Sequence, residues 1–289
     1  MSNGGSLEAA VAEALGASVT ASEALSGGMI GAVRRVSLSD GRRVVAKTSP
    51  GGGLEVEAFM LRTLAASSPL PVPAVLHASD DLLVLEELPG RPGVRSDAAQ
   101  AHLAELLAET HAVEGPAFGL ERNTLLGPFE LPNGWMEDGV AFFRERRLRW
   151  ALGLAAESGH LPKGLQGEIE GVAARLPELL GDYAPRPVLL HGDLWSGNVL
   201  SDGERVTGVL DPAVHYGDAE TELAFIDLFG GVGQAFWRRY DGLAGVPEAF
   251  WAWRRALWQL VPLLVHVALF GGGYVGPLRA RVQQVVRAS

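Results

Sequence analysis

The sequence predicts an α+β protein of two lobes, a small N-terminal lobe built on an antiparallel sheet and a larger, mainly helical C-terminal lobe. Short β-prone runs fill the chain up to about Leu88, and long segments with the apolar spacing of helices follow it. A break at Pro89–Pro92 separates the two regions. We therefore place the N-terminal lobe at residues 1–88 and the C-terminal lobe at residues 89–289. Because the linker is so short, the lobes are expected to share a cleft.

Composition restricts the possible function classes. A chain of 289 residues, of which 47% are hydrophobic and 20% charged, can bury a sizeable core. The absence of cysteine excludes disulfides, a disulfide-linked oligomer and a cysteine nucleophile. A formal net charge of −10 argues against a nucleic-acid surface, because such a surface needs clustered Lys and Arg side chains.

The sequence gives no sign of export or membrane insertion. Met1–Gly5 lacks the basic and apolar regions of a secretory signal. The stretch Trp251–Phe270 is as long as a membrane span, but it contains Arg254, Arg255 and His266. We therefore expect buried helices of a soluble protein there, and a cytoplasmic location by default.

The elements of the N-terminal lobe follow from local patterns. Ala32–Leu38 and Arg43–Lys47 are β-prone runs joined by Ser39-Asp40-Gly41, which contains the Asp-Gly pair favoured in hairpin turns. Leu82–Leu85 is a continuous apolar run, short enough to be a buried strand. The helices predicted in this lobe are Leu7–Leu15, capped by Ser6, and Leu54–Ala65, ended before Pro71 and Pro73.

The C-terminal lobe is predicted from helical spacing interrupted by two short strands. The expected helices are Asp97–His111, Met136–Leu154, Gln166–Leu180, Glu220–Phe229 and Phe250–Leu269. The expected strands are Val188–Leu190 and Val206–Leu210. A second hairpin is predicted where Val199 and Leu200 precede the turn Ser201–Glu204, because this turn leads directly into the strand Val206–Leu210.

The polar string His191–Asn198 follows the strand Val188–Leu190, so its side chains are held at a strand end over the cleft. The second hairpin returns Asp211 towards Asn198. An amide oxygen and a carboxylate suit Mg²⁺, which prefers hard oxygen ligands and shares its shell with water and phosphate. We therefore predict Asn198 and Asp211 as metal ligands, and Asp193 as the base that accepts a hydroxyl proton.

This layout resembles the protein-kinase catalytic loop, in which a His-x-Asp-Leu-x-x-x-Asn string supplies the base and a metal ligand and a later Asp binds Mg²⁺. Asp193 and Asn198 have the same spacing as in that string. Two departures favour a small-molecule kinase over a protein kinase. Gly192 replaces the usual Arg, and Asp211-Pro212-Ala213 replaces Asp-Phe-Gly.

The upstream region supplies the other parts of an ATP site in kinase order. Gly27 and Gly28 lie in a glycine-rich stretch that would let backbone N–H groups approach the phosphates. Lys47 ends the second hairpin strand, like the phosphate-binding Lys of kinases. Glu57, rather than Glu55, is expected to hold Lys47 by an ion pair.

The hinge between the lobes completes the predicted nucleotide site. The backbone from Glu86 to Leu88 would hydrogen-bond the adenine, as the inter-lobe connection does in the kinase fold that the motifs resemble. Taken singly, Lys47 and Glu57 would each be interpreted as an ordinary charged side chain in contact with water. Their order before Asp193, Asn198 and Asp211 favours the functional interpretation.

A more specific resemblance is to the fructosamine kinases, also called ketosamine-3-kinases. It is carried by His-Gly-Asp-Leu-Trp-Ser-Gly-Asn at His191–Asn198, by Leu210–Asp218, and by Trp135 with Phe142–Leu148. The resemblance implies a protein-kinase-like fold, ATP and Mg²⁺ as cofactors, and phosphorylation of the C3 hydroxyl of small-molecule or protein-linked ketosamines. The product then decomposes and frees the amine, so the resemblance also implies deglycation.

Trp195 is predicted to contact the acceptor, because an indole offers an apolar face for a sugar ring and one N–H donor. The alternative is a Trp buried between loop and helices. His191 is interpreted as structural and Asp218 as a helix N-cap. Ser196 lacks the Gly-x-Ser-x-Gly context of a hydrolase nucleophile, because Leu194 occupies the first glycine position.

Two other functions remain open at this point. One is another small-alcohol kinase, of the aminoglycoside or choline type. The other is a nucleotide-binding pseudokinase, an interaction module without phosphotransfer. Intact Lys47, Asp193, Asn198 and Asp211 argue against the pseudokinase.

Overall fold

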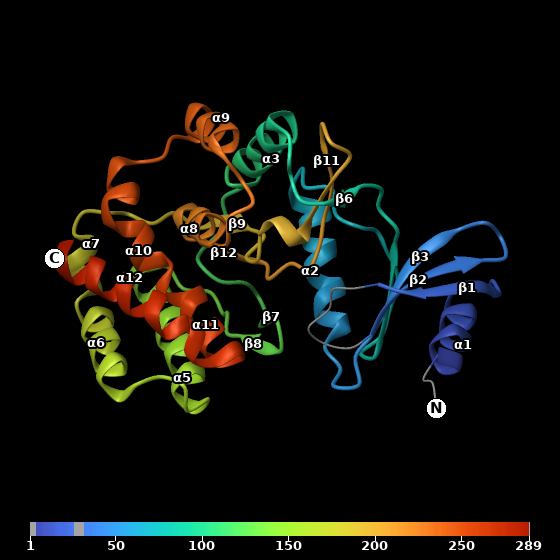
Figure 1. The fold of residues 1–289 in the computed structure, drawn as a ribbon, viewed down its shortest axis with the longest axis horizontal. Helices are drawn as coiled ribbons and strands as arrows, with labels where there is room; N and C mark the ends of the chain where they lie inside the picture. Colours follow the sequence, from blue (N-terminus) through green and yellow to red (C-terminus); the bar gives the residue numbers. More distant parts are fainter. Residues whose placement is uncertain (1–3, 26–31, 289) are drawn as a thin grey trace.

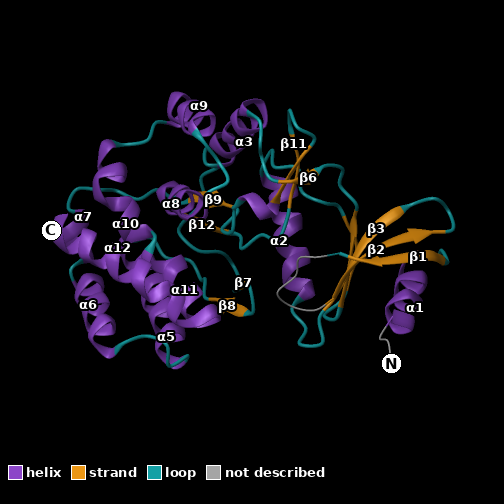
Figure 2. Ribbon diagram, viewed as in Figure 1, coloured by secondary structure: helices purple, strands orange, loops and turns teal. Residues whose placement is uncertain are grey.

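The computed structural model describes residues 4–25 and 32–288 and has the two predicted lobes. Figure 1 shows a sheet with helix α1 at one end of the molecule and a larger group of helices at the other. The strands of the sheet and the helices of the second lobe are separated in Figure 2, with helix α2 between them. The two ends of the chain lie at opposite ends of the molecule. The bilobal α+β fold is therefore confirmed.

The N-terminal sheet has five strands in the order β1-β2-β3-β5-β4, with antiparallel neighbours throughout. Its strands are β1 (Val19–Ala24), β2 (Ala32–Leu38), β3 (Arg43–Thr48), β4 (Val75–Ala78) and β5 (Leu82–Glu86). The predicted hairpin of β2 and β3 and the buried strand β5 are confirmed. The two edge strands were not predicted, because β1 and β4 carry no run of buried residues.

Helices cover the two faces of this sheet. Helix α1 (Gly4–Leu15) packs on the face that contains Val44, Ala46 and Val84, and helix α2 (Leu54–Ser67) packs on the face that contains Leu83 and Leu85. The predicted cap at Ser6 is wrong, since the helix already begins two residues earlier.

Helix α2 also contributes to the C-terminal lobe. Met60 and Leu64 are fully buried and belong to the large core of that lobe, whereas Leu54, Ala58 and Leu61 belong to the cluster under the sheet. Helix α2 therefore touches both lobes and fixes the side chains that it carries relative to each.

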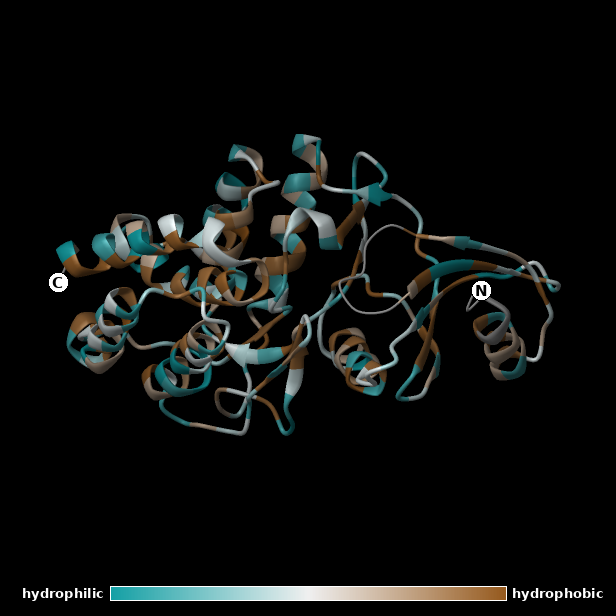
Figure 3. Cartoon of the chain, turned by 60° about the horizontal axis from the view of Figure 1, so that its bottom comes forward, coloured by the Kyte–Doolittle hydropathy of each residue, from teal (hydrophilic) through white to brown (hydrophobic). Residues whose placement is uncertain are grey.

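The helices of the C-terminal lobe surround one continuous apolar core. Figure 3 shows hydrophobic and hydrophilic residues on different sides of the same helices, as expected for helices that cover a core. The helices are α3 (Asp97–Thr110), α4 (Gly139–Phe142), α5 (Arg149–Glu157), α6 (Lys163–Ala174), α7 (Leu176–Leu180), α8 (Ala219–Phe229), α9 (Gln234–Ala244), α10 (Arg255–Trp258), α11 (Leu260–Phe270) and α12 (Val275–Ala288).

Two predicted helix boundaries are wrong, each for a local reason, and a third predicted helix is found with internal irregularities. The helix expected from Met136 begins at Gly139, capped by Asp138, because Met136 is bridged to Phe118 instead. The helix expected over 166–180 begins at Lys163 and is divided at Arg175, next to a proline in the first turn of α7. The helix expected over 250–269 begins with a π-helical turn, Phe250–Arg254, and is divided between α10 and α11.

The short strands of this lobe hold its loops. Strand β9 (Val188–Leu190) pairs with β12 (His215–Gly217), and β10 (Val199–Ser201) pairs with both β11 (Val206–Val209) and β6 (Arg91–Pro92). The predicted second hairpin, β10–β11, is therefore confirmed. A further hairpin, β7 (Thr124–Leu126) with β8 (Phe129–Leu131), was not predicted.

The helical run Phe250–Ala288 is long and apolar enough to cross a membrane by length and composition alone, with a mean hydropathy of 1.5 over its most apolar window. Of that window, 61% is buried inside the protein. Such burial is typical of the core helices of a folded domain. This finding gives only weak evidence for a membrane span.

Candidate active site

The loop His191–Asn198 connects β9 to β10 and ends in a 3₁₀ turn, Ser196–Asn198. Gly192 has a φ of 85°, and a Cβ at this position would lie 2.1 Å from the carbonyl oxygen of Ala213. A side chain here would collide with the segment that follows Asp211. The glycine in place of the usual protein-kinase Arg therefore has a steric cause.

His191 is structural, as predicted. Its ring is buried, its Nε2 lies 3.1 Å from the carbonyl oxygen of Leu210, and its Nδ1 accepts a hydrogen bond from the backbone N–H of Asp193 at 3.3 Å. Burial lowers the pKa of the His191 imidazole below its ordinary value. A neutral ring with Nε2–H fits both contacts. His191 thus joins the loop to the strand end that precedes Asp211.

Asp193 and Asn198 are in contact. The side-chain amide of Asn198 donates to the backbone oxygen of Asp193 at 2.8 Å and to its carboxylate Oδ2 at 3.2 Å. Burial raises the pKa of Asp193 to about 8, the negative charge of Asp211 raises it as well, and the Asn198 hydrogen bond opposes both. Asp193 is therefore a stronger base than an exposed carboxylate.

Asp211 returns to this loop through the β10–β11 hairpin. The backbone N–H of Leu210 donates to the carbonyl oxygen of Asn198 at 2.8 Å, so Asp211 begins directly beside Asn198. Within the described ranges, Asp211 is the only non-glycine residue with positive φ, at 53°. Such left-handed backbone costs energy and is often found at functional sites.

Lys47 joins the two lobes at this point. Its Nζ donates to Glu57 Oε1 at 2.6 Å and also to Asp211 Oδ1. Successive side chains of a strand alternate between faces, so Lys47 lies on the α2 side of the sheet, opposite Ala46. Burial lowers the pKa of the Lys47 ammonium, but Asp211 and Glu57 outweigh this effect and raise the pKa above its ordinary value. Glu55 is exposed, in agreement with the preference for Glu57.

The hinge residues follow β5 directly. The backbone N–H of Glu86 donates to Ala74 at 2.9 Å, and the backbone of Leu88 forms no hydrogen bond with any other residue that the structure describes. Between them, the Glu87 carboxylate accepts hydrogen bonds from Arg35 and from Arg43, the latter at 2.6 Å. These two ion pairs attach the hinge to strands β2 and β3 and were not predicted from the sequence.

The remaining predicted site residues are Gly27, Gly28 and Trp195. Gly27 and Gly28 lie outside the described residues. The side chain of Trp195 is 42% exposed, which contradicts the alternative of a Trp buried between loop and helices. Its ring lies over Gly197, where a Cβ would be 2.3 Å from the indole.

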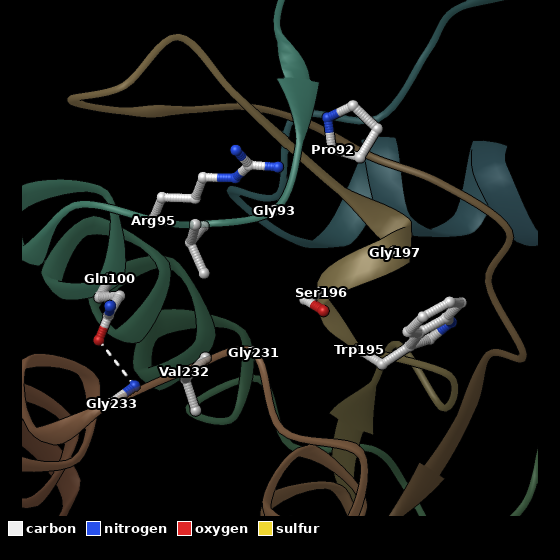
Figure 4. Close-up of a pocket in the computed structure, with 11 residues that line it drawn as sticks. Pro92, Gly93, Arg95, Gln100, Trp195, Ser196, Gly197, Gly231, Val232 and Gly233 are labelled. Atoms are coloured by element: carbon white, nitrogen blue, oxygen red, sulfur yellow. Dashed lines mark hydrogen bonds between the residues drawn. The ribbon is translucent and has the colours of Figure 1, made fainter.

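Trp195 lines a pocket of about 590 Å³ together with Ser196 and Gly197. The other walls are the segment Pro92–Arg95, Gln100 of helix α3 and the loop Gly231–Gly233 (Figure 4). The pocket is therefore lined by residues that follow Asp193 closely in the chain, and Lys47 does not line it.

Glu222, which lies in α8 and is 3% exposed, was not predicted as a site residue. Its carboxylate accepts hydrogen bonds from the backbone N–H groups of His191 and Gly192, at 3.2 and 2.6 Å. It also lies 3.0 Å from His111 Nε2. Glu222 lies within the predicted helix Glu220–Phe229. The sequence did not single it out, because Asp218 and Glu220 are acidic residues in the same short stretch. Asp218 caps α8, as predicted, by accepting from the backbone N–H of Glu220.

The donor set at this site fits a divalent cation that is shared with phosphate. The Asn198 amide is oriented by its N–H donation to Asp193, which leaves its oxygen as a free ligand. One carboxylate of Asp211 adds a second oxygen. In the part of the chain that the structure describes, no group of three or more His, Asp or Glu residues could hold a metal by itself. Mg²⁺ suits such a site, because it takes one or two protein ligands and completes its shell with phosphate and water oxygens.

Comparisons with known proteins agree with this geometry. The family model of the fructosamine kinases matches residues 6–288. A probable ketoamine kinase of Synechocystis is 36% identical over 241 residues, which are 81% of this chain and 78% of the relative. A fructosamine-3-kinase homologue from Thermobifida fusca superposes with a TM-score of 0.88 at 33% identity, covering 98% of this chain and 99% of the homologue. An aminoglycoside phosphotransferase shares the fold, with a TM-score of 0.67 at 21% identity and 99% coverage of both chains.

Proposed function

Because the chain belongs to the fructosamine kinase family, whose members are phosphotransferases acting on hydroxyl groups, we propose that it phosphorylates the C3 hydroxyl of ketosamines with ATP. The phosphorylated product decomposes and frees the amine, so the proposed outcome is deglycation. The acceptor is a ketosamine in free form or linked to a protein. The proposed compartment is the cytoplasm.

One observation carries the proposal. Lys47 from the N-terminal lobe and Asp211 from the C-terminal lobe are joined by a hydrogen bond, and Asp211 follows the strand that is bonded to Asn198. Glu57 holds Lys47, and Asn198 holds Asp193. A cation for phosphate, oxygen ligands for a metal and a carboxylate base thus lie in one connected set, as phosphoryl transfer requires.

In the proposed mechanism, the acceptor hydroxyl oxygen attacks the γ-phosphorus while the bond to the β–γ bridging oxygen breaks on the opposite side. The hydroxyl proton passes to Asp193, whose pKa of about 8 makes it a suitable base near neutral pH. Most of the acceleration comes from positioning and charge neutralisation. The magnesium ion supplies positive charge against the phosphate oxygens when bound, and Asn198 and Asp211 would hold it.

The remaining residues are assigned to the nucleotide and the acceptor. Lys47, kept charged by Glu57, binds phosphate oxygens once the nucleotide displaces Asp211 from it. The Glu86 carbonyl oxygen and the Leu88 N–H face the adenine, a role favoured by the absence of other described partners for Leu88. Gly27 and Gly28 cover the phosphates, and Trp195 contacts the acceptor.

We also propose residue 88 as the lobe boundary, with residues 1–88 as the nucleotide lobe and residues 89–289 as the catalytic lobe. The hinge supports this choice, because the sheet ends at Glu86 and the chain next pairs with β10 of the other lobe. Met60 and Leu64 in α2 cross this boundary by packing into the larger core. The two lobes should therefore unfold together.

The direct test is incubation of the protein with Mg-ATP and a panel of ketosamines, aminoglycosides and choline, with ADP release as the signal. We expect ketosamine-dependent ADP release and a product phosphorylated at C3, which NMR would locate. Turnover of an aminoglycoside or choline alone would favour the second candidate, another small-alcohol kinase. ATP binding without any turnover would favour a pseudokinase.

A further inference from the structure

The pocket beside Trp195 has an unusual polar composition. Among the described residues that line it, Arg95 is the only charged side chain, and no carboxylate lines it. The chain as a whole has a formal net charge of −10, so a pocket with one cation and no anion differs from the average surface. Such a pocket attracts a negatively charged ligand.

Three residues with hydrogen-bond donors line this pocket from separate segments (Figure 4). Arg95 is exposed and forms no ion pair with any carboxylate in residues 4–25 and 32–288. The Gln100 Oε1 accepts a hydrogen bond from the backbone N–H of Gly233 at 2.7 Å, which orients the amide and leaves its NH₂ group free to donate. The Ser196 hydroxyl has no hydrogen-bond partner among the described residues.

The walls of the pocket are held in place by close contacts. Gly231 has a φ of +92°, and a Cβ there would lie 2.2 Å from Cβ of Ser196. The loop that contains Gly231 therefore rests directly on the catalytic loop. At its other end, the same loop is fixed to α3 by the bond between Gly233 and Gln100. A pocket with such walls is formed before a ligand arrives, and its volume lies in the range of ligand-binding pockets.

The lining of this pocket favours the acceptor over the nucleotide as its ligand. None of the residues assigned to phosphate or metal, Lys47, Asn198 and Asp211, lines it. Its wall begins at Trp195, two residues beyond the proposed base. An acceptor with its hydroxyl at Asp193 would extend past Trp195 into the pocket.

We propose that this pocket binds an anionic group of the acceptor through Arg95, Gln100 and Ser196, and that the substrates are therefore anionic ketosamines. This inference rests on the proposed function. A donor set of one guanidinium, one amide NH₂ and one hydroxyl matches a carboxylate or a phosphate, and a neutral amine would leave the guanidinium unpaired. The anionic group has two possible sources, the carboxylate of an amino acid on the amine side or a phosphate on the sugar.

The test uses three matched acceptors: fructosylglycine, the neutral fructosylglycinamide, and the 6-phosphate of that amide. We expect kcat/KM for the preferred anionic acceptor to exceed that of the neutral amide about tenfold, the size of one charge-assisted hydrogen bond. The better of the two anionic acceptors identifies the source of the charge. The preference should weaken as salt concentration rises, because Arg95 is exposed.

Arg95→Gln should remove this preference, because kcat/KM should fall about tenfold more on the preferred anionic acceptor than on the neutral amide. Arg91→Gln is the matched control, because Arg91 is an exposed arginine in the same segment that does not line the pocket. This control should keep the preference. Equal loss on all three acceptors in Arg95→Gln, or equal turnover of all three by the wild type, overturns the inference and leaves the proposed function intact.

Calorimetric binding of the three acceptors without nucleotide separates the two proposals. Tighter binding of an anionic acceptor, lost in Arg95→Gln, supports the pocket assignment even if no acceptor is phosphorylated. The absence of turnover for every ketosamine would instead reject the proposed function. Equal binding of the charged and neutral acceptors would reject the pocket assignment.

Discussion

The carboxylate of Glu222 in helix α8 accepts a hydrogen bond from the backbone N–H of Gly192 at 2.6 Å, immediately before Asp193. The same carboxylate lies 3.0 Å from His111 Nε2, and His111 Nδ1 lies 2.7 Å from the hydroxyl of Tyr240. A buried chain of polar groups thus runs from α9 through α3 and α8 to the loop of the proposed base. Glu222 positions this loop without touching the substrate.

Glu222→Gln should lower both the free energy of unfolding, by about 1–3 kcal/mol, and kcat, because a neutral amide replaces a buried acceptor of several hydrogen bonds. Burial raises the pKa of Glu222, but the hydrogen bonds of His111 and Gly192 outweigh it and hold the pKa below the ordinary 4.5. Because the pKa of Glu222 is lower in the folded than in the unfolded protein, its ionised carboxylate stabilises the fold above pH 4.5. This stabilisation is lost as pH falls through the pKa of the folded state.

The difference in stability between wild type and Glu222→Gln should therefore be largest at neutral pH and shrink in acid. Urea unfolding across this pH range measures it. A constant difference at all pH values would show that folding leaves the pKa of Glu222 unchanged. Unchanged Mg-ATP affinity with reduced kcat would separate loop positioning from general misfolding.

Asp193→Asn should keep the fold and Mg-ATP binding while kcat falls roughly 10²- to 10⁴-fold, the loss expected when a general base is removed. The pH dependence of the free energy of unfolding provides the control. Because the folded pKa of Asp193 is raised to about 8, its ionisation costs stability as pH rises towards that value. The variant should therefore gain stability relative to wild type as pH rises from the ordinary carboxyl pKa of 3.8 to about 8, with no further gain above that pH. Near-normal kcat would exclude Asp193 as the base.

Asp211→Ala should abolish productive Mg²⁺ binding, since this substitution removes the carboxylate ligand of the proposed metal site. The measurement is the dependence of ADP release on magnesium concentration. The variant also removes one of the two carboxylates that hold Lys47, so Glu57→Gln serves as the comparison. Glu57→Gln should weaken ATP binding and leave the magnesium midpoint in place. An unchanged magnesium dependence in Asp211→Ala would contradict the metal assignment.

Trp195→Ala should reduce kcat/KM on ketosamines selectively, while basal ATP hydrolysis and the melting temperature stay close to wild type. The reason is that the indole is 42% exposed beside the proposed base, so its removal takes away a contact surface and leaves the core intact. The three quantities are measured on the same preparation. Unchanged discrimination between ketosamines and other alcohols would remove Trp195 from the acceptor site.

The catalytic loop and its flanking strands could be predicted from sequence because their signals are local. The string His191–Asn198 needs no distant partner to be recognised, and the turns that close the hairpins of β2–β3 and β10–β11 are encoded by the residues within them. The order of Lys47, Glu57 and Asp211 in the chain also indicated a kinase site. Their convergence through direct hydrogen bonds was an inference that needed the fold.

Elements without a local signal were missed. Strands β1 and β4 lie at the sheet edges, where one side of a strand needs no partner and buried residues are few. Helix α12, which was not predicted, follows three consecutive glycines, Gly271–Gly273, and glycine has low helix propensity. In both cases tertiary packing, rather than intrinsic propensity, determines the secondary structure.

By itself, the sequence determined the two-lobed fold, the identity of the base and metal-ligand candidates, and the family of the chain. Tertiary structure alone decided that Glu222 supports the loop of Asp193, and that Arg95, Gln100 and Ser196 line one pocket. The physical reason is that these groups act through contacts between segments far apart in the chain. Burial and the presence or absence of a partner are properties of the folded arrangement, and residue spacing does not encode them.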